Sequence, residues 1–191
     1  MPKRLSREFY TRPTLIVAKD LLGKYLVRKQ GNKKFIGKIV ETEAYLGPKD
    51  KAAHSYGGKI TDRSKTFYLK GGHLYIYLCY GIYWMLNIVT EKKNKPEAVL
   101  IRALEPIGDY DFKKIKNLSN GPGKLCRWLR INKSFNEIDL VKSNKIWLEK
   151  GEKTKKSQIK ASRRVGVDYA KEWAKKPWRF YISENPFASR R

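Results

Sequence analysis

The segment Leu74–Asn87 constrains the fold more than any other part of this chain. Tyrosine, tryptophan and aliphatic residues fill most of it, and aromatic and β-branched residues favour strands. Tyr80-Gly81 offers a turn near the middle, because glycine accepts the positive φ that tight hairpin turns require. The segment therefore predicts a β-hairpin with Tyr80 near its tip, although Tyr80 is also explained as one more strand aromatic.

A second pair of strands is predicted at Lys24–Arg28 and Phe35–Tyr45, joined by a turn around Gly31-Asn32. Alternate side chains of a strand share a face. One face of the second strand thus carries Ile39, Glu41, Glu43 and Tyr45, and the other carries Val40, Thr42, Ala44 and Leu46. A carboxylate therefore stands beside an aromatic ring, but this geometry does not choose between Glu41 and Glu43.

Arg102 lies inside the apolar strand predicted at Ala98–Leu104. A charged side chain in such a strand needs a partner, because burying an unpaired charge is costly. A structural ion pair with Glu43 would satisfy it, so these two residues do not by themselves indicate catalysis.

The remaining segments mix helices and strands without a β-α-β rhythm. Pro13 to Leu22 predicts an amphipathic helix. The glycine-rich turn Gly121–Lys124 predicts the start of another helix, where free N–H groups can hold a phosphate. Further expectations are a long surface loop at Gly47–Gly72, short strands at Ile146–Leu148 and Arg179–Ile182, and a short helix at Tyr169–Lys175. This mixture predicts an α+β fold on an antiparallel sheet, in one domain spanning residues 1–191.

The charge of the chain indicates a polyanionic partner. Its 191 residues include 43 Lys and Arg against 18 Asp and Glu, a formal net charge of +25. A folded domain with such an excess usually meets nucleic acid or an anionic membrane surface. Part of the excess could instead reflect a lysine-rich proteome.

The chain shows no sign of a membrane segment or a metal site. No apolar run approaches the about 18 residues of a membrane span, and no signal-peptide pattern follows the N-terminus. We therefore expect no membrane partner and a cytoplasmic location, nucleoid-associated in a prokaryote or nuclear in a eukaryote. Cys79 and Cys126 form no CxxC pair and the histidines lie far apart, so we expect reduced cysteines in a core and no metal.

Several motifs follow one another along almost the whole chain. They are Glu41–Pro48 with Asp50, Ala52–Ser55, Tyr75–Tyr77, Tyr80-Gly81, Leu100–Pro106, Gly121–Cys126, Ile131–Phe135 and Arg164–Val167. Together they resemble the signature of the alkyladenine (3-methyladenine) DNA glycosylases, over roughly residues 13–187. Asp62, where that family commonly has proline, and Phe67–Gly72 depart from the signature. They alter the expected pocket rim, so the substrate range is less defined than the reaction.

The resemblance implies a single compact α+β domain with a curved antiparallel sheet, surrounding helices and a protruding β-hairpin. It implies a monofunctional glycosylase of base excision repair, which flips a damaged purine out of duplex DNA and hydrolyses its N-glycosidic bond. An abasic site remains, and no metal or cofactor is needed. The expected substrates are 3-methyladenine, 7-methylguanine, ethenoadenine and hypoxanthine in double-stranded DNA, bound by a monomer.

The same resemblance assigns the catalytic residues. Glu43, rather than Glu41, matches the glutamate that activates the hydrolytic water. Arg102 and the main-chain carbonyl of Val165 match its other water ligands. Arg102 would also lower the pKa of Glu43 and hold it ionised, as a nearby positive charge does.

The residues that match the family's DNA-binding positions form three groups. Tyr45, His54 and Tyr77 match the stacking residues of a base pocket, in which aromatic faces attract a cationic base. Asn87 matches a position that disfavours the amino group of guanine. Tyr80 matches the residue that intercalates into the duplex, with Ile82 supporting it. The backbone-contacting positions are matched by Lys59, Thr61, Arg63, Lys124 and Lys133.

Other interpretations fit parts of the sequence. Gly121–Gly123 resembles the turn of the helix–hairpin–helix glycosylases, but those are largely helical and the first half of this chain is strand-rich. A non-enzymatic basic DNA- or RNA-binding protein would explain the charge and the aromatics, but gives no reason for Glu43 beside Tyr45. From the residues alone, His54 is also explained as a loop histidine, and each lysine as an ordinary solvated charge.

Overall fold

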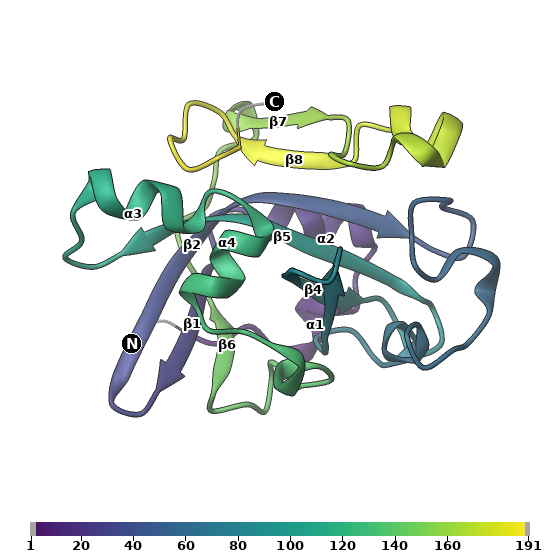
Figure 1. Cartoon of the computed structure of the whole chain (residues 1–191), viewed down its shortest axis with the longest axis horizontal. Helices are drawn as coiled ribbons and strands as arrows, with labels where there is room; N and C mark the ends of the chain where they lie inside the picture. The colour runs from purple at the N-terminus through teal and green to yellow at the C-terminus, as the bar shows by residue number, and fades with distance from the viewer. Residues whose placement is uncertain (1–2, 190–191) are drawn as a thin grey trace.

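One antiparallel sheet of eight strands organises the chain (Figure 1). This computed structural model describes residues 3–189, apart from the side chains at 112–114 and 116. The strands are β1 Tyr25–Gln30, β2 Lys33–Leu46, β3 Leu74–Cys79, β4 Tyr83–Thr90, β5 Glu97–Ile107, β6 Ile146–Glu149, β7 Ile159–Ser162 and β8 Arg179–Ile182. The predicted α+β class is confirmed, and this sheet rules out the largely helical alternative.

Strand β2 is the centre of the sheet, in the order β3-β4-β5-β2-β1-β6. It pairs with β5 on one side, and on the other its first half pairs with β1 and residues 41–43 pair with β8. In Figure 1 the β7–β8 pair lies along the top of the view, over the second half of β2. The sheet thus branches at the segment that carries Glu41 and Glu43.

A bulge marks the β2–β5 pairing at this branch. Ile39 pairs with Leu104 and Glu41 with Ala103, so the register passes over Val40. It then moves to Thr42 opposite Ile101 and passes over Arg102. Bulges bend strands and redirect side chains, and they are frequent next to active sites.

The helices are short and lie on both faces of the sheet. They are α1 Arg7–Tyr10, α2 Thr14–Asp20, α3 Phe112–Ser119 and α4 Pro122–Trp128, with 3-10 turns η1 Tyr56–Gly58, η2 Lys65–Tyr68, η3 Lys133–Phe135, η4 Lys156–Gln158 and η5 Asp168–Lys175. Figure 1 shows α4 in front of the sheet and α2 behind it. The helix expected after Pro13 is confirmed, whereas the segment expected as a helix at Tyr169–Lys175 is a 3-10 turn kinked at Lys171.

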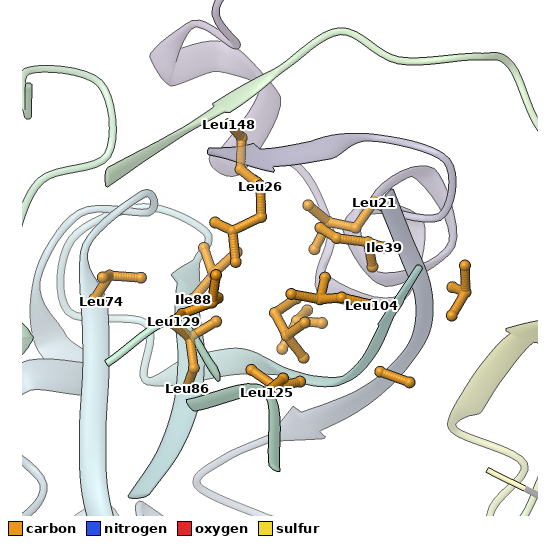
Figure 2. Close-up of a cluster of buried hydrophobic side chains, with 14 of the residues drawn as sticks. Leu21, Leu26, Ile39, Leu74, Leu86, Ile88, Leu104, Leu125, Leu129 and Leu148 are labelled. Atoms are coloured by element: carbon orange, nitrogen blue, oxygen red, sulfur yellow. The ribbon is translucent and has the colours of Figure 1, made fainter. Parts of the chain in front are cut away.

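The core fills the space between the sheet and these helices. Figure 2 shows Ile39 and Leu104 of the central strands among leucines of the flanking elements, including Leu21, Leu125 and Leu129. All five side chains are fully buried. Gly123 lets α4 approach the β3–β4 hairpin, because a Cβ there would lie 2.8 Å from Cδ1 of Tyr83.

The hairpin predicted at Leu74–Asn87 is confirmed. β3 and β4 pair from Leu74–Ile88 to Cys79–Tyr83, and both Tyr80 and Gly81 have positive φ, 50° and 68°. The side chain of Tyr80 is 86% exposed and that of Ile82 is 65% exposed. A non-glycine residue in this conformation at a bare tip is uncommon and often functional.

The segment Gly47–Gly72 is an irregular loop, but it is not purely a surface loop as expected. Asp50, Ser55 and Phe67 are buried, and the loop folds back closely on itself. A Cβ at Gly47 would lie 1.9 Å from Oγ of Ser55, so only glycine fits there. This packing fixes the loop beside the end of β2.

Candidate active site

The carboxylate of Glu43 lies at the centre of a buried cluster of polar groups. Its side chain is fully buried. Oε1 accepts a hydrogen bond from the backbone N–H of Val165 at 2.7 Å and pairs with Nη1 of Arg102 at 3.3 Å, while Oε2 accepts from the hydroxyl of Tyr45 at 2.8 Å. The structure therefore brings Glu43, Arg102, Val165 and Tyr45 together, with the N–H of Val165 rather than its carbonyl in contact with the carboxylate.

Burial raises the pKa of Glu43 above its ordinary value, because the charged form loses its hydration. Arg102, the N–H of Val165 and the hydroxyl of Tyr45 act in the opposite direction, whereas the nearby charge of Glu41 adds to the rise. Arg102 thus lowers the pKa of Glu43 as expected, but burial acts more strongly and the net direction is upward.

Glu41 lies on the same face but has different partners. It is fully buried, and its Oε1 accepts hydrogen bonds from Nε of Arg102 at 2.9 Å and Nε of Arg179 at 2.7 Å. Ser189 donates to both carboxylate oxygens. Arg102 thus lies between the two carboxylates, which sequence spacing alone could not distinguish.

An open cavity of about 440 Å³ lies against this cluster, within the about 300–1,000 Å³ of typical small-molecule sites. Its lining includes all four residues expected in the base pocket: Tyr45, His54, Tyr77 and Asn87. Arg102, Val165 and Tyr80 line it as well. Glu43 is not part of the lining. The three residues that contact its carboxylate do line the cavity, so they separate Glu43 from it.

The aromatic wall of the cavity contains two residues, Tyr75 and Phe67, that were not among the expected base-stacking residues. Tyr75 and Tyr77 stack with centroids 5.4 Å apart and planes at 23°, and Phe67 packs on Tyr75 at 4.4 Å. The ring of His54 meets Tyr77 edge-on at 4.5 Å. The i, i+2 spacing of Tyr75 and Tyr77 in a strand was a signal for Tyr75. Phe67 begins the segment Phe67–Gly72, which was expected to alter the pocket rim, and it lines the cavity.

His54 is held as a neutral ring. Its Nδ1 lies 2.9 Å from the hydroxyl of Tyr75 and its Nε2 lies 3.1 Å from Nη2 of Arg63. Because an arginine only donates, Nε2 accepts and the ring proton is on Nδ1. Burial and then the charge of Arg63 lower the pKa of His54 to about 4. The ring is therefore uncharged near neutral pH.

A buried ion pair fixes the segment that carries Val165. Arg164 donates to both carboxylate oxygens of Asp50, at 2.5 and 2.9 Å, and both side chains are fully buried. The same guanidinium donates to the carbonyl oxygens of Ala44 and Trp173. It therefore joins β2, the Gly47–Gly72 loop and the C-terminal third of the chain beside Glu43.

Asn87 is buried in β4 and donates from Nδ2 to the carbonyl of Tyr75 at 3.2 Å. The five residues expected to contact the DNA backbone are all exposed: Lys59, Thr61, Arg63, Lys124 and Lys133. Three of them have partners: Lys124 donates to Asn120, the hydroxyl of Thr61 is 3.1 Å from that of Ser64, and Arg63 donates to His54. Arg63 lines the cavity as well, a place that sequence analysis did not give it.

Among residues 3–189, no three His, Cys, Asp or Glu side chains gather as metal ligands would. No helix in the same range is long and apolar enough to cross a membrane. Both cysteines are free; Cys126 is buried, while Cys79 at the end of β3 is only partly so.

The chain is similar to proteins of one family over nearly its whole length. Residues 8–186 match the family described as Methylpurine-DNA glycosylase (MPG). A protein from Clostridium novyi (strain NT), named "Putative 3-methyladenine DNA glycosylase", is 48% identical, covering 99% of this chain and 100% of the relative. A protein of the same name from Borreliella burgdorferi (strain ZS7) is 46% identical, covering 98% of this chain and 100% of the relative.

Proposed function

The chain belongs to the methylpurine-DNA glycosylase family, and from that premise we propose that it flips alkylated or deaminated purines out of duplex DNA and hydrolyses their glycosidic bonds with water activated by Glu43. Membership of the family makes it a base-excision-repair enzyme that cleaves N-glycosyl bonds. The proposal adds the substrates, the residues and the order of events. The enzyme proposed here is monofunctional: it releases the base without cleaving the strand, so an abasic site remains.

One observation carries the mechanism: a buried carboxylate directly behind the wall of an open aromatic cavity. An ionised carboxylate offers about four lone-pair sites. Among the described residues, three donors reach Glu43, and only the hydroxyl of Tyr45 reaches Oε2. Oε2 therefore keeps capacity for a water at the boundary between Tyr45, Arg102 and Val165.

That water would attack the sugar carbon of the flipped nucleotide. Glu43 accepts its proton, and its negative charge stabilises the cationic sugar that develops as the base departs. The raised pKa of Glu43 suits this role, because a general base works best when its pKa lies near the working pH. General base catalysis of this kind is typically worth about 10²–10⁴-fold in rate.

The exposed tip of the hairpin is suited to extruding the base. Tyr80 lines the cavity and is also almost fully exposed. An inserted ring can occupy the gap that the base leaves in the stack, as minor-groove proteins do with apolar wedges. Ile82 lies beside it at the same tip.

The substrates are 3-methyladenine, 7-methylguanine, ethenoadenine and hypoxanthine in double-stranded DNA, and the protein acts as a monomer. Stacking of a cationic base on Tyr77 and Tyr45 contributes about 1–2 kcal/mol, roughly tenfold in affinity. The neutral state of His54 adds no repulsion. Arg63, 5.7 Å from the ring of Tyr77, opposes a cationic base, so weaker glycosidic bonds and easier flipping of damaged bases must supply the rest of the selectivity.

The test is base release from a duplex that carries one ethenoadenine or hypoxanthine. We expect hot alkali to cleave the treated strand at the lesion, and no cleavage without alkali. Glu43→Gln is expected to lose excision by about 10²–10⁴-fold while it still binds the lesion. Glu97→Gln is the matched control, because it removes another buried carboxylate of the sheet, bonded to Thr14 and outside the cavity.

Full excision by Glu43→Gln would reject Glu43 as the base. Absence of base release from these duplexes and from methylated DNA with the wild-type protein would instead reject the enzymatic proposal and favour a basic binding protein.

A further inference from the structure

Glu41 is a buried carboxylate that accepts four hydrogen bonds close to the cavity. Its Oε1 accepts from Arg102 Nε at 2.9 Å, Arg179 Nε at 2.7 Å and the hydroxyl of Ser189 at 2.7 Å, and its Oε2 accepts from the N–H of Ser189 at 2.7 Å. Four donors match the acceptor capacity of a carboxylate. Glu41 does not line the cavity, and of its three partner residues only Arg102 does. A role of Glu41 in the reaction must therefore pass through Arg102.

The neighbour that reaches the cavity is Arg102. Its Nε is bonded to Glu41 and its Nη1 is 3.3 Å from Oε1 of Glu43. A guanidinium is a rigid planar fork, so holding Nε fixes the direction of Nη1. If Nε were released, Arg102 could turn toward Glu43 and form the bidentate pair that arginine and carboxylate groups favour.

Such a bidentate pair would occupy Oε2, the oxygen that retains capacity for water. It would also bring the positive charge closer to Glu43 and make that carboxylate a weaker base. The contact with Glu41 prevents both effects, because it shares the charge of Arg102 between two carboxylates.

We propose that Glu41 is a positioning residue for hydrolysis, which holds Arg102 by Nε so that Glu43 stays open to water. The proposal rests on the function proposed above. Arg179 and Ser189 hold Glu41 in place by donating hydrogen bonds to it. They also contact each other, because Arg179 donates from Nη2 to the carbonyl of Ser189 at 2.7 Å. Strand β8 and the chain after it thus support the active site although neither Arg179 nor Ser189 lines the cavity.

The experiment compares Glu41→Gln with wild type and with Glu97→Gln in single-turnover excision of hypoxanthine across the acid side of the pH profile. We expect Glu41→Gln to lose about 10²-fold in rate, the typical cost of a misplaced catalytic group, with unchanged affinity for the lesion duplex. Its acid inflection should move to lower pH, because the charge of Arg102 then acts on Glu43 alone. Loss of the charge of Glu41 contributes to this shift by itself. The distinguishing readout is therefore Ser189→Ala, which keeps every charge: its inflection should also move to lower pH, which neither lost charge nor a purely structural role would cause. Glu97→Gln should keep the wild-type rate and inflection.

Ser189→Ala is the milder second variant, because it removes one donor to Glu41 and keeps every charge. It should lose about fivefold in rate, the worth of one hydrogen bond, and should fold even if Glu41→Gln does not. A wild-type rate in Glu41→Gln, or a wild-type rate and inflection in Ser189→Ala, would overturn the positioning role. This outcome leaves the proposed function intact, provided that the wild type excises and Glu43→Gln does not. If the wild-type protein releases no base, both proposals fall.

Discussion

At the residue scale, the site depends on two carboxylates that share one face of β2 and differ in their partners. Glu41 faces Arg179 and Ser189, while Glu43 faces Tyr45 and Val165, and Arg102 touches both. Burial without full neutralisation gives Glu43 the raised pKa of a useful base. Apart from Tyr45, the partners that distinguish the two carboxylates lie far away in the sequence.

The pH dependence of excision should reflect the raised pKa of Glu43. The ionised form is the base, so the rate should fall as pH drops through this pKa. We expect the acid inflection above the ordinary value of 4.5, measured by single-turnover excision of hypoxanthine. An inflection at or below 4.5 would mean that Arg102 and the other donors outweigh burial at Glu43.

The protonation state of His54 should depend on Arg63. Burial and the charge of Arg63 lower the pKa of His54 to about 4, and Arg63→Gln removes one of these causes. We expect the pKa of His54 to rise toward its ordinary 6.5 without reaching it, since burial remains. An NMR titration of the imidazole signals measures this directly. A His73→Gln variant assigns the signals, and an unchanged pKa would show that Arg63 has no such effect.

At the scale of elements, strands rich in apolar and aromatic residues were predictable, including the short strands β6 and β8, whereas other short or irregular pieces were not. β3, β4 and the central part of β5 follow from their apolar and aromatic residues, and so does the hairpin tip. α1 and β7 span four residues each, too short for a periodic pattern to show. The bulge at Arg102 and the buried anchoring of the Gly47–Gly72 loop depend on distant partners, which no local pattern indicates.

Tyr80 at the hairpin tip should contribute to base flipping rather than to the stability of the fold. Tyr80→Ser should reduce the fluorescence change that accompanies extrusion of ethenoadenine and weaken lesion binding, with little effect on unfolding because the side chain is 86% exposed. Tyr80→Phe is the matched control, since it keeps the ring and should flip normally. Normal flipping by Tyr80→Ser would remove the wedge from the mechanism.

The ion pair between Asp50 and Arg164 should be the main stabilising contact of the loop beside the site. Asp50→Ala leaves a buried guanidinium without its carboxylate, which typically costs about 3–5 kcal/mol. Asp20→Ala is the control, because its pair with Arg12 is exposed and such pairs contribute at most about 1 kcal/mol. Urea unfolding should separate the two variants, and equal losses would show that burial of this pair has no special effect.

At the scale of the whole molecule, the net charge of +25 follows from the sequence, but the distribution of that charge over the surface does not. The proposed DNA contacts Lys59, Lys124 and Lys133 are exposed, and so are Lys29, Lys33 and Lys34 at the far end of the β1–β2 pair. Figure 1 shows this end of β1 and β2 pointing away from the loop that follows β2. Two sets of lysines with equal charge therefore differ only in position.

This difference allows contacts to be separated from overall charge. If about five phosphates are neutralised, log affinity against log salt should have a slope near −4 to −5. Replacing Lys59, Lys124 and Lys133 together by glutamine should reduce the slope to about −2, because each contact contributes about 0.9. The same change at Lys29, Lys33 and Lys34 removes equal charge and should leave the slope near its wild-type value. Measured by fluorescence anisotropy with a lesion duplex, an equal reduction in both triple variants would mean that the whole charge of the molecule, rather than a defined face, governs DNA binding.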